Sequence, residues 1–245
     1  METLPARRYC VECALVLSLC SELPEFGRDD GGTGSGGRVL RSFAKRTHST
    51  LHRWVLSYAP ELDKRVRPHL NQTNDSWRVD ETYIQVKGVW KYLYRAVDSL
   101  GNTLDFMLSA KRDGKAAARF FRKVLKADHT QAPRVSRYAS FVELTVDKNA
   151  AYPVAVEALK ADETLAAEAE YRQSKYMNNI IEQDHRNVKR LTKPMMGFGS
   201  FNTARQTLRG IEAMSMIHKG QVKGIGKGDS VSQAKFIEDP FGISA

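Results

Sequence analysis

The chain lacks most of the short signals that would place it in a common enzyme class. Its three cysteines, Cys10, Cys13 and Cys20, are too few and too early for a disulfide framework. Cys10 and Cys13 could form half of a zinc site, but no second pair or His-x-x-x-His follows. No Gly-x-x-x-x-Gly-Lys-Ser/Thr loop and no Gly-x-Ser-x-Gly elbow occurs, so neither P-loop nucleotide hydrolysis nor serine hydrolysis is indicated.

Long hydrophobic runs are also missing. The apolar stretch over residues 10–20 is interrupted by Glu12 and is far too short to span a bilayer, so we expect a cytoplasmic protein. Acidic residues are scarce: 28 Asp and Glu stand against 38 Lys and Arg, a formal charge of +10. That excess favours a polyanionic partner, nucleic acid first, although net charge alone is weak support. With 42% hydrophobic residues, the chain can bury a sizeable core.

Composition divides the chain into four parts. Residues 1–47 fit no fold, and residues 27–37 are glycine-dense, as in a linker or a disordered segment. Residues 48–70 hold a short amphipathic helix over Ser49–Tyr58, ended near Pro60, and then a charged connector. Residues 71–220 carry the core, and residues 221–245 form a flexible tail.

Over residues 71–220, the order of the predicted strands and helices indicates an α/β domain with a mixed sheet flanked by helices. Three meandering strands come first, then a helix, a strand, a helix, a short strand and two helices. This is the order of the ribonuclease H-like fold. The predicted strands are Trp77–Lys87, Val89–Asp98, Thr103–Ala110, Phe141–Val146 and Tyr171–Tyr176, and the predicted helices are Lys115–Ala127, Tyr152–Ala169, Asn178–Leu191 and Phe201–Lys219, the last capped by Ser200.

Three carboxylates on these elements are spaced like metal ligands. Asp80 lies on the first strand, Asp147 ends the fourth, and Glu182 lies on the helix 35 positions later. Carboxylates from different elements can hold two Mg²⁺ ions for in-line attack on a phosphodiester. Each also has an ordinary interpretation. Asp80 could be an exposed acid at a strand end, and neighbouring Glu81 is an equal candidate for the functional residue. Asp147 could cap a helix, and Glu182 could form a surface pair with Arg186.

Basic residues accompany the third acid. Arg186, Lys189 and Lys193 follow Glu182 at helical spacing, and six basic residues stand against two acids between positions 172 and 193. Such density beside a carboxylate site suits a phosphate backbone. His185 could steer a water or phosphate, but a surface position on the helix is commoner. Aromatic residues of the second strand (Trp90, Tyr92, Tyr94) suit core and cross-strand packing better than base stacking.

Five segments around these residues resemble the DDE transposases of bacterial insertion sequences, most closely the insertion-sequence-six family. The resemblance spans about residues 48–221 and is carried by five blocks: Asp80–Ile84, Trp90–Ser99, Thr145–Asn149, Lys175–Arg186 and Gly210–Met214. It implies an integrase-type core with Asp80, Asp147 and Glu182 as catalytic triad and ligands of two Mg²⁺ ions, with Mn²⁺ as a substitute. It further implies a bacterial, nucleoid-associated protein that acts as an oligomer on terminal inverted repeats and a target duplex. Candidate DNA contacts are Arg53, Lys148, Arg186, Lys189, Arg190 and Lys193.

The chain departs from that family at two places. The stretch Arg134–Phe141 is longer and more polar than expected, and only Ser49–Tyr58 resembles the usual helix-turn-helix. Codons for Ser21–Gly34 can, one nucleotide later, encode Pro-Ser-Tyr-Arg-Asn-Leu-Glu-Glu-Met-Met-Ala-Glu-Arg-Gly, which resembles the missing first helices. We therefore hypothesise that residues 1–47 are read in the wrong frame. Two rival functions stay open: a ribonuclease H-like nuclease without strand transfer, and an inactive DNA-binding remnant of a decayed element.

Overall fold

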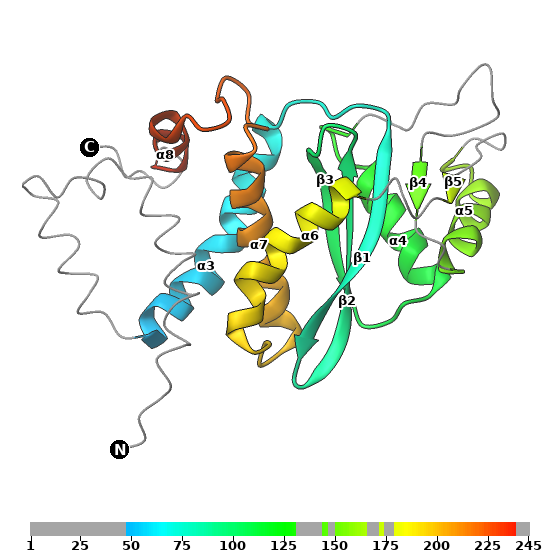
Figure 1. The fold of residues 1–245 in the computed structure, drawn as a ribbon, viewed down its shortest axis with the longest axis horizontal. Coiled ribbons are helices and arrows are strands. Elements are labelled where there is room, and N and C mark those ends of the chain that lie inside the picture. The colour runs from blue at the N-terminus through cyan, green and yellow to red at the C-terminus, as the bar shows by residue number, and fades with distance from the viewer. Residues whose placement is uncertain (1–47, 131–143, 147–149, 166–171, 174–178, 239–245) are drawn as a thin grey trace, which may run out of the picture. The chain divides into compact units, whose positions relative to one another are not determined.

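A five-stranded mixed sheet lies within residues 71–190 of the computed structural model (Figure 1). The structure describes residues 48–130, 144–146, 150–165, 172–173 and 179–238. Residues 1–47, with the three cysteines and the frame-shift candidate, and the Arg134–Phe141 stretch lie outside the described part. The chain divides into two units, one over Asn71–Arg190 and one built from the described residues on either side.

The sheet has the strand order β3-β2-β1-β4-β5. Its strands are β1 (Trp77–Val86), β2 (Val89–Asp98), β3 (Thr103–Ser109), β4 (Leu144–Val146) and β5 (Arg172–Gln173). The first three are antiparallel, whereas β4 is parallel to β1 and β5 is parallel to β4. This order and these directions confirm the predicted ribonuclease H-like sheet.

The β1–β2 hairpin closes through a two-residue turn. Lys87 and Gly88 both have positive φ, 51° and 75°, which is the backbone of a type I′ turn. The turn pairs Val86 with Val89 and sets the register along both strands. Asp80 therefore lies directly opposite Arg95, on the same face of the sheet.

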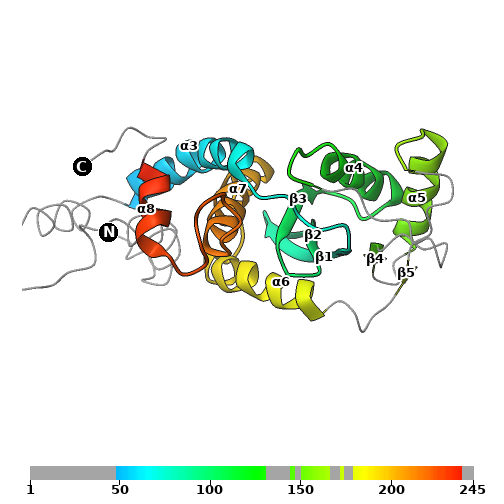
Figure 2. The same ribbon diagram turned by 90° about the horizontal axis from the view of Figure 1, so that it is seen from above.

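Helices cover the two faces of this sheet differently (Figure 2). On one face, α4 (Gly114–Leu125) and α5 (Ala151–Ala161) bury an aromatic and aliphatic core with Trp77, Tyr94 and Phe120. Asp113 caps α4 by accepting a 2.8 Å hydrogen bond from the Ala116 amide. The other face carries α6 (Asn179–Thr192).

The second unit is helical. Its elements are α3 (His48–Val66), the 3-10 turns η1 (Arg67–His69) and η3 (Lys193–Met195), α7 (Phe201–His218) and α8 (Ser230–Glu238). The predicted stop near Pro60 is wrong, because α3 continues to Val66. Proline removes one helical hydrogen bond, but Leu62 and Val66 beyond it are buried in a core with α7, which offsets that loss.

The C-terminal end of the described chain is more ordered than the flexible tail predicted from residue 221. The predicted start of α7 is confirmed, since Ser200 forms a capping box with Thr203. After α7, Gly220 has φ +74°, and a Cβ there would meet the Lys227 nitrogen at 2.5 Å. The backbone thus folds back, Val222 bridges to Leu70, and α8 buries Ile237. Burial of these few apolar residues is a long-range effect that local composition hides.

No helix in the described ranges is long and apolar enough to cross a membrane.

Candidate active site beneath helix α6

Asp80 lies on the face of β1 that α6 covers. Its side chain is 17% exposed, and its Oδ2 lies 3.5 Å from Nδ1 of His185 on α6. Glu182 precedes His185 by three residues, so it lies on nearly the same side of the helix, one turn earlier. Glu182 is exposed in the first turn of α6. The structure thus brings the first and third predicted carboxylates to one side of the sheet.

Asp147 and Lys148 lie outside the described residues. The described part of β4 ends at Val146, which pairs in parallel with Val79. Val146 and Val79 are the residues immediately before Asp147 and Asp80 in the sequence. The register between β1 and β4 is therefore defined up to Val79 and Val146, each of which is followed in the sequence by one of the two acids.

Beneath α6 lies a buried ion pair that sequence reasoning missed. Arg95 on β2 is fully buried, and its Nη2 lies 2.6 Å from Oδ2 of Asp184, whose side chain is 6% exposed. An arginine within the apolar alternation of a central strand was the available signal, because such a side chain needs a buried anionic partner. Asp184 gave no comparable signal.

His185 is buried, which corrects the expectation of a histidine on the helix surface. Ile181, Asp184, His185 and Val188 recur at helical spacing and all face inward, so the buried side of α6 is partly polar. Burial lowers the pKa of His185 to about 3, the charges of Arg95 and Lys189 act in the same direction, and Asp184 opposes them. The imidazole next to Asp80 is therefore neutral at physiological pH.

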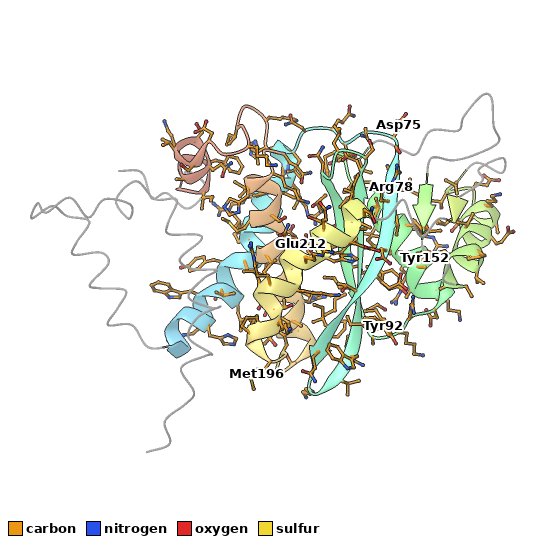
Figure 3. The ribbon with its side chains drawn as sticks, in the orientation of Figure 1. Asp75, Arg78, Tyr92, Tyr152, Met196 and Glu212 are labelled. Atoms are coloured by element: carbon orange, nitrogen blue, oxygen red, sulfur yellow. The ribbon has the colours of Figure 1, made fainter. Side chains whose placement is uncertain are left out.

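Glu81, the alternative to Asp80, points to the opposite face. Its side chain is 1% exposed, its Oε1 accepts from Nε of Arg112, and its Oε2 accepts from the hydroxyl of Tyr152. In Figure 3, Tyr152 lies beside β1. Burial, followed by the charge of Glu81, raises the pKa of Tyr152 well above its usual value. Glu81 therefore ties β1 to α5 inside the protein.

The predicted DNA-contact residues that the structure describes are all exposed. Arg186, Lys189 and Arg190 lie on α6, and Arg53 lies on α3. Lys193 begins the turn η3, since α6 ends at Thr192.

The aromatic residues of β2 divide between core and surface. Tyr94 is buried in the core, as predicted, and packs against Phe120 with ring centres 5.8 Å apart. Trp90 is 59% exposed and contacts Tyr83 across the hairpin, edge to face, at 6.4 Å. Cross-strand packing therefore holds for Trp90, but core burial does not.

The donors at Asp80 and Glu182 suit a divalent cation. Both are carboxylates, the oxygen ligands that Mg²⁺ prefers, and both side chains reach solvent. The described ranges contain no group of three or more His, Cys, Asp or Glu side chains arranged for a metal. Asp147 is outside those ranges, so the described part of the site supplies two of three expected ligands.

Comparison with known proteins identifies related sequences. A family model of the DDE domain of IS240-type transposases matches residues 74–221. The chain is 37% identical over 173 residues, 70% of each protein, to the transposase of the insertion sequence-like element IS431mec of Staphylococcus aureus (strain Mu50) and to that of IS257 in transposon Tn4003 of the same species. A chain in the cryo-EM structure of a simian T-cell lymphotropic virus intasome with PP2A regulatory subunit B56 gamma superposes with TM-score 0.41 at 11% identity, over 57% of this chain and 48% of that one.

Proposed function

Because the chain belongs to the insertion-sequence-six (IS6) family of DDE transposases, we propose that it cuts and joins DNA strands at the ends of an insertion sequence. Asp80, Asp147 and Glu182 are the catalytic carboxylates in this proposal and hold two Mg²⁺ ions. When bound there, the ions would supply Lewis-acid chemistry for attack by a water or 3′-hydroxyl and for departure of the leaving oxygen. The substrates are the terminal inverted repeats and a target duplex, bound by an oligomer.

The observation that carries this assignment is the parallel pairing of Val79 with Val146. Each is followed by one of the proposed aspartates, and neighbouring parallel strands present equivalent positions at the same place on the sheet. The 3.5 Å contact between Asp80 and His185 supports the assignment further, because His185 lies on the helix that also carries Glu182. Glu81 is a poor alternative because it is buried and bound by Arg112 and Tyr152.

The other residues of the site have supporting roles in the proposal. Neutral His185 packs against Asp80 and limits the rotamers of its carboxylate. The exposed cations Arg186, Lys189, Arg190 and Lys193, with Arg53 and Lys148, hold backbone phosphates, which gives affinity and register without base specificity.

The test replaces each acid with its amide. Asp80→Asn, Asp147→Asn and Glu182→Gln should each abolish Mg²⁺-dependent cleavage of a labelled inverted-repeat duplex and joining of its 3′ end to a second duplex. Binding to the same duplex in Ca²⁺ should persist. Glu157→Gln, an exposed acid on α5, is the matched control and should remain active. Full activity in any of the three variants removes that residue from the site.

The same assay separates the two rivals. Cleavage without joining identifies a nuclease, and binding without either reaction by the unmodified chain identifies an inactive remnant. The proposed frame shift over residues 1–47 bears on the second outcome, because a reader domain would be needed to find the repeats. Resequencing the gene tests it, and codons for Ser21–Gly34 that cannot yield the alternative string reject it.

A further inference from the structure

The buried pair of Arg95 and Asp184 differs from three other ion pairs of the same unit. In the pairs Arg112–Glu81, Arg122–Asp162 and Lys123–Asp105, the cation is 34–41% exposed. Arg95 is 0% exposed, and Asp184 is 6% exposed. Both charges of this pair have therefore lost nearly all contact with water.

Stability is a weak explanation for such a pair. Removing two charges from water costs several kcal/mol per ion, and apolar side chains of similar size are often as stabilising or more so. Where a buried ion pair is retained, the benefit it can bring is a defined geometry, because a guanidinium accepts a carboxylate in few orientations.

The position of the pair indicates which geometry it defines. Arg95 is the cross-strand partner of Asp80, and Asp184 is the neighbour of His185, which contacts Asp80 at 3.5 Å. Glu182 lies two residues before Asp184. A slip of α6 by one residue would move it about 1.5 Å and rotate it about 100°. Such a slip would break the 2.6 Å Arg95–Asp184 contact and turn Glu182 through the same angle about the axis of α6.

We propose that Arg95 and Asp184 are positioning residues that lock the rotation and height of α6, so that Glu182 and Asp80 face the same metal ions. This inference rests on the function proposed above. Neither Arg95 nor Asp184 is proposed to contact DNA or metal. Both act by placing the carboxylates of Asp80 and Glu182.

The central test is the double variant Arg95→Met/Asp184→Leu in the full chain. A purely structural pair predicts that the apolar replacement keeps folding and function together. A positioning pair predicts cooperative urea unfolding with a midpoint near that of the wild type, but Mn²⁺ binding weaker by about 10–100-fold, the range seen when groups that orient metal ligands are lost. Electron paramagnetic resonance measures the concentration of free Mn²⁺ in the absence of DNA. The rate of strand cleavage, assayed separately, should fall in parallel.

The matched control is Lys123→Met/Asp105→Leu, which removes an ion pair with an equally buried acid on α4 and β3 and should leave Mn²⁺ binding unchanged. If the Arg95/Asp184 double variant does not fold, Arg95→Lys decides, because it keeps the charge but loses the planar fork. It should fold and bind Mn²⁺ several-fold more weakly. Wild-type Mn²⁺ affinity in the folded double variant, or in Arg95→Lys, overturns the proposal.

Asp80→Asn and Glu182→Gln are titrated alongside to separate two kinds of failure. If both lose Mn²⁺ binding while the Arg95 and Asp184 variants keep it, only the positioning role is wrong. If both bind Mn²⁺ as the wild type does, the proposed metal site itself is wrong.

Discussion

Asp80 and Glu81 are adjacent on one strand, yet the two faces of the sheet treat them differently. On the face covered by α4 and α5, Glu81 is 1% exposed and receives hydrogen bonds from Arg112 and Tyr152. On the face covered by α6, Asp80 is 17% exposed and contacts a neutral histidine at 3.5 Å. Glu81 is thus held inside the core by hydrogen bonds, whereas Asp80 stays open to solvent.

The surroundings of a carboxylate therefore decide whether it can serve as a metal ligand. An acid whose oxygens accept two hydrogen bonds inside a core is stabilised where it is, and a metal ion would have to displace both donors. An acid at the rim of a buried polar cluster stays accessible to an ion from solvent.

The largest expected contrast is in catalysis. Asp80→Asn should lower the rate of Mg²⁺-dependent strand cleavage by about 10³-fold or more, whereas Glu81→Gln should lower it by about tenfold or less. Single-turnover cleavage of an end-labelled duplex measures both rates. Equal losses in the two variants would mean that the faces are not functionally distinct.

Stability should show the opposite order. Glu81→Leu leaves the hydroxyl of Tyr152 and the guanidinium of Arg112 without their acceptor, so the free energy of unfolding should fall by about 2 kcal/mol, less than for a fully buried pair because Arg112 is one-third exposed. Asp80→Asn should change it by less than about 1 kcal/mol. Urea denaturation followed by tryptophan fluorescence gives both values, and a larger loss for Asp80→Asn would contradict the comparison.

A smaller effect is expected from the tyrosine that holds Glu81. Tyr152→Phe removes one buried hydrogen bond and should cost about 1–2 kcal/mol in the free energy of unfolding. Tyr94→Phe is the control, since the hydroxyl of Tyr94 is buried with no hydrogen-bond partner among the described residues. In urea denaturation of both variants, that control should be neutral or slightly stabilising. A destabilised Tyr94→Phe and an unaffected Tyr152→Phe would reverse the assignment.

The smallest contrast concerns DNA affinity. Lys189→Ala on α6 should weaken binding to any duplex and lower the slope of log K against log salt concentration by about one. Arg119→Ala, an exposed cation on α4, should leave that slope unchanged. Fluorescence anisotropy at several salt concentrations measures both slopes. Equal slopes for the two variants would show that the DNA phosphates prefer neither the α6 face nor the α4 face of the sheet.

Local pattern was sufficient for much of the fold. Alternation predicted β1 and β2 within a residue of their observed bounds, and the Ser200 cap predicted the start of α7. Local pattern failed where distant residues decide the outcome. Helix α3 continues through Pro60 because Leu62 and Val66 find an apolar partner surface on α7, and α8 forms where a tail was expected. The assignment of Asp80, Asp147 and Glu182 as metal ligands remains a prediction.

The sequence was enough to give the order of elements from β1 to α7, the period of each and the family, because backbone geometry imposes the periods and the family blocks are contiguous. It also placed Asp80 and Glu81 on opposite faces of a strand, since successive side chains alternate. Three features depend on the three-dimensional packing: which face of the sheet is open, the pairing of Arg95 with Asp184, and the burial of His185. Those facts depend on how a helix sits on a sheet, which is set by long-range packing and desolvation and leaves little trace in neighbouring residues.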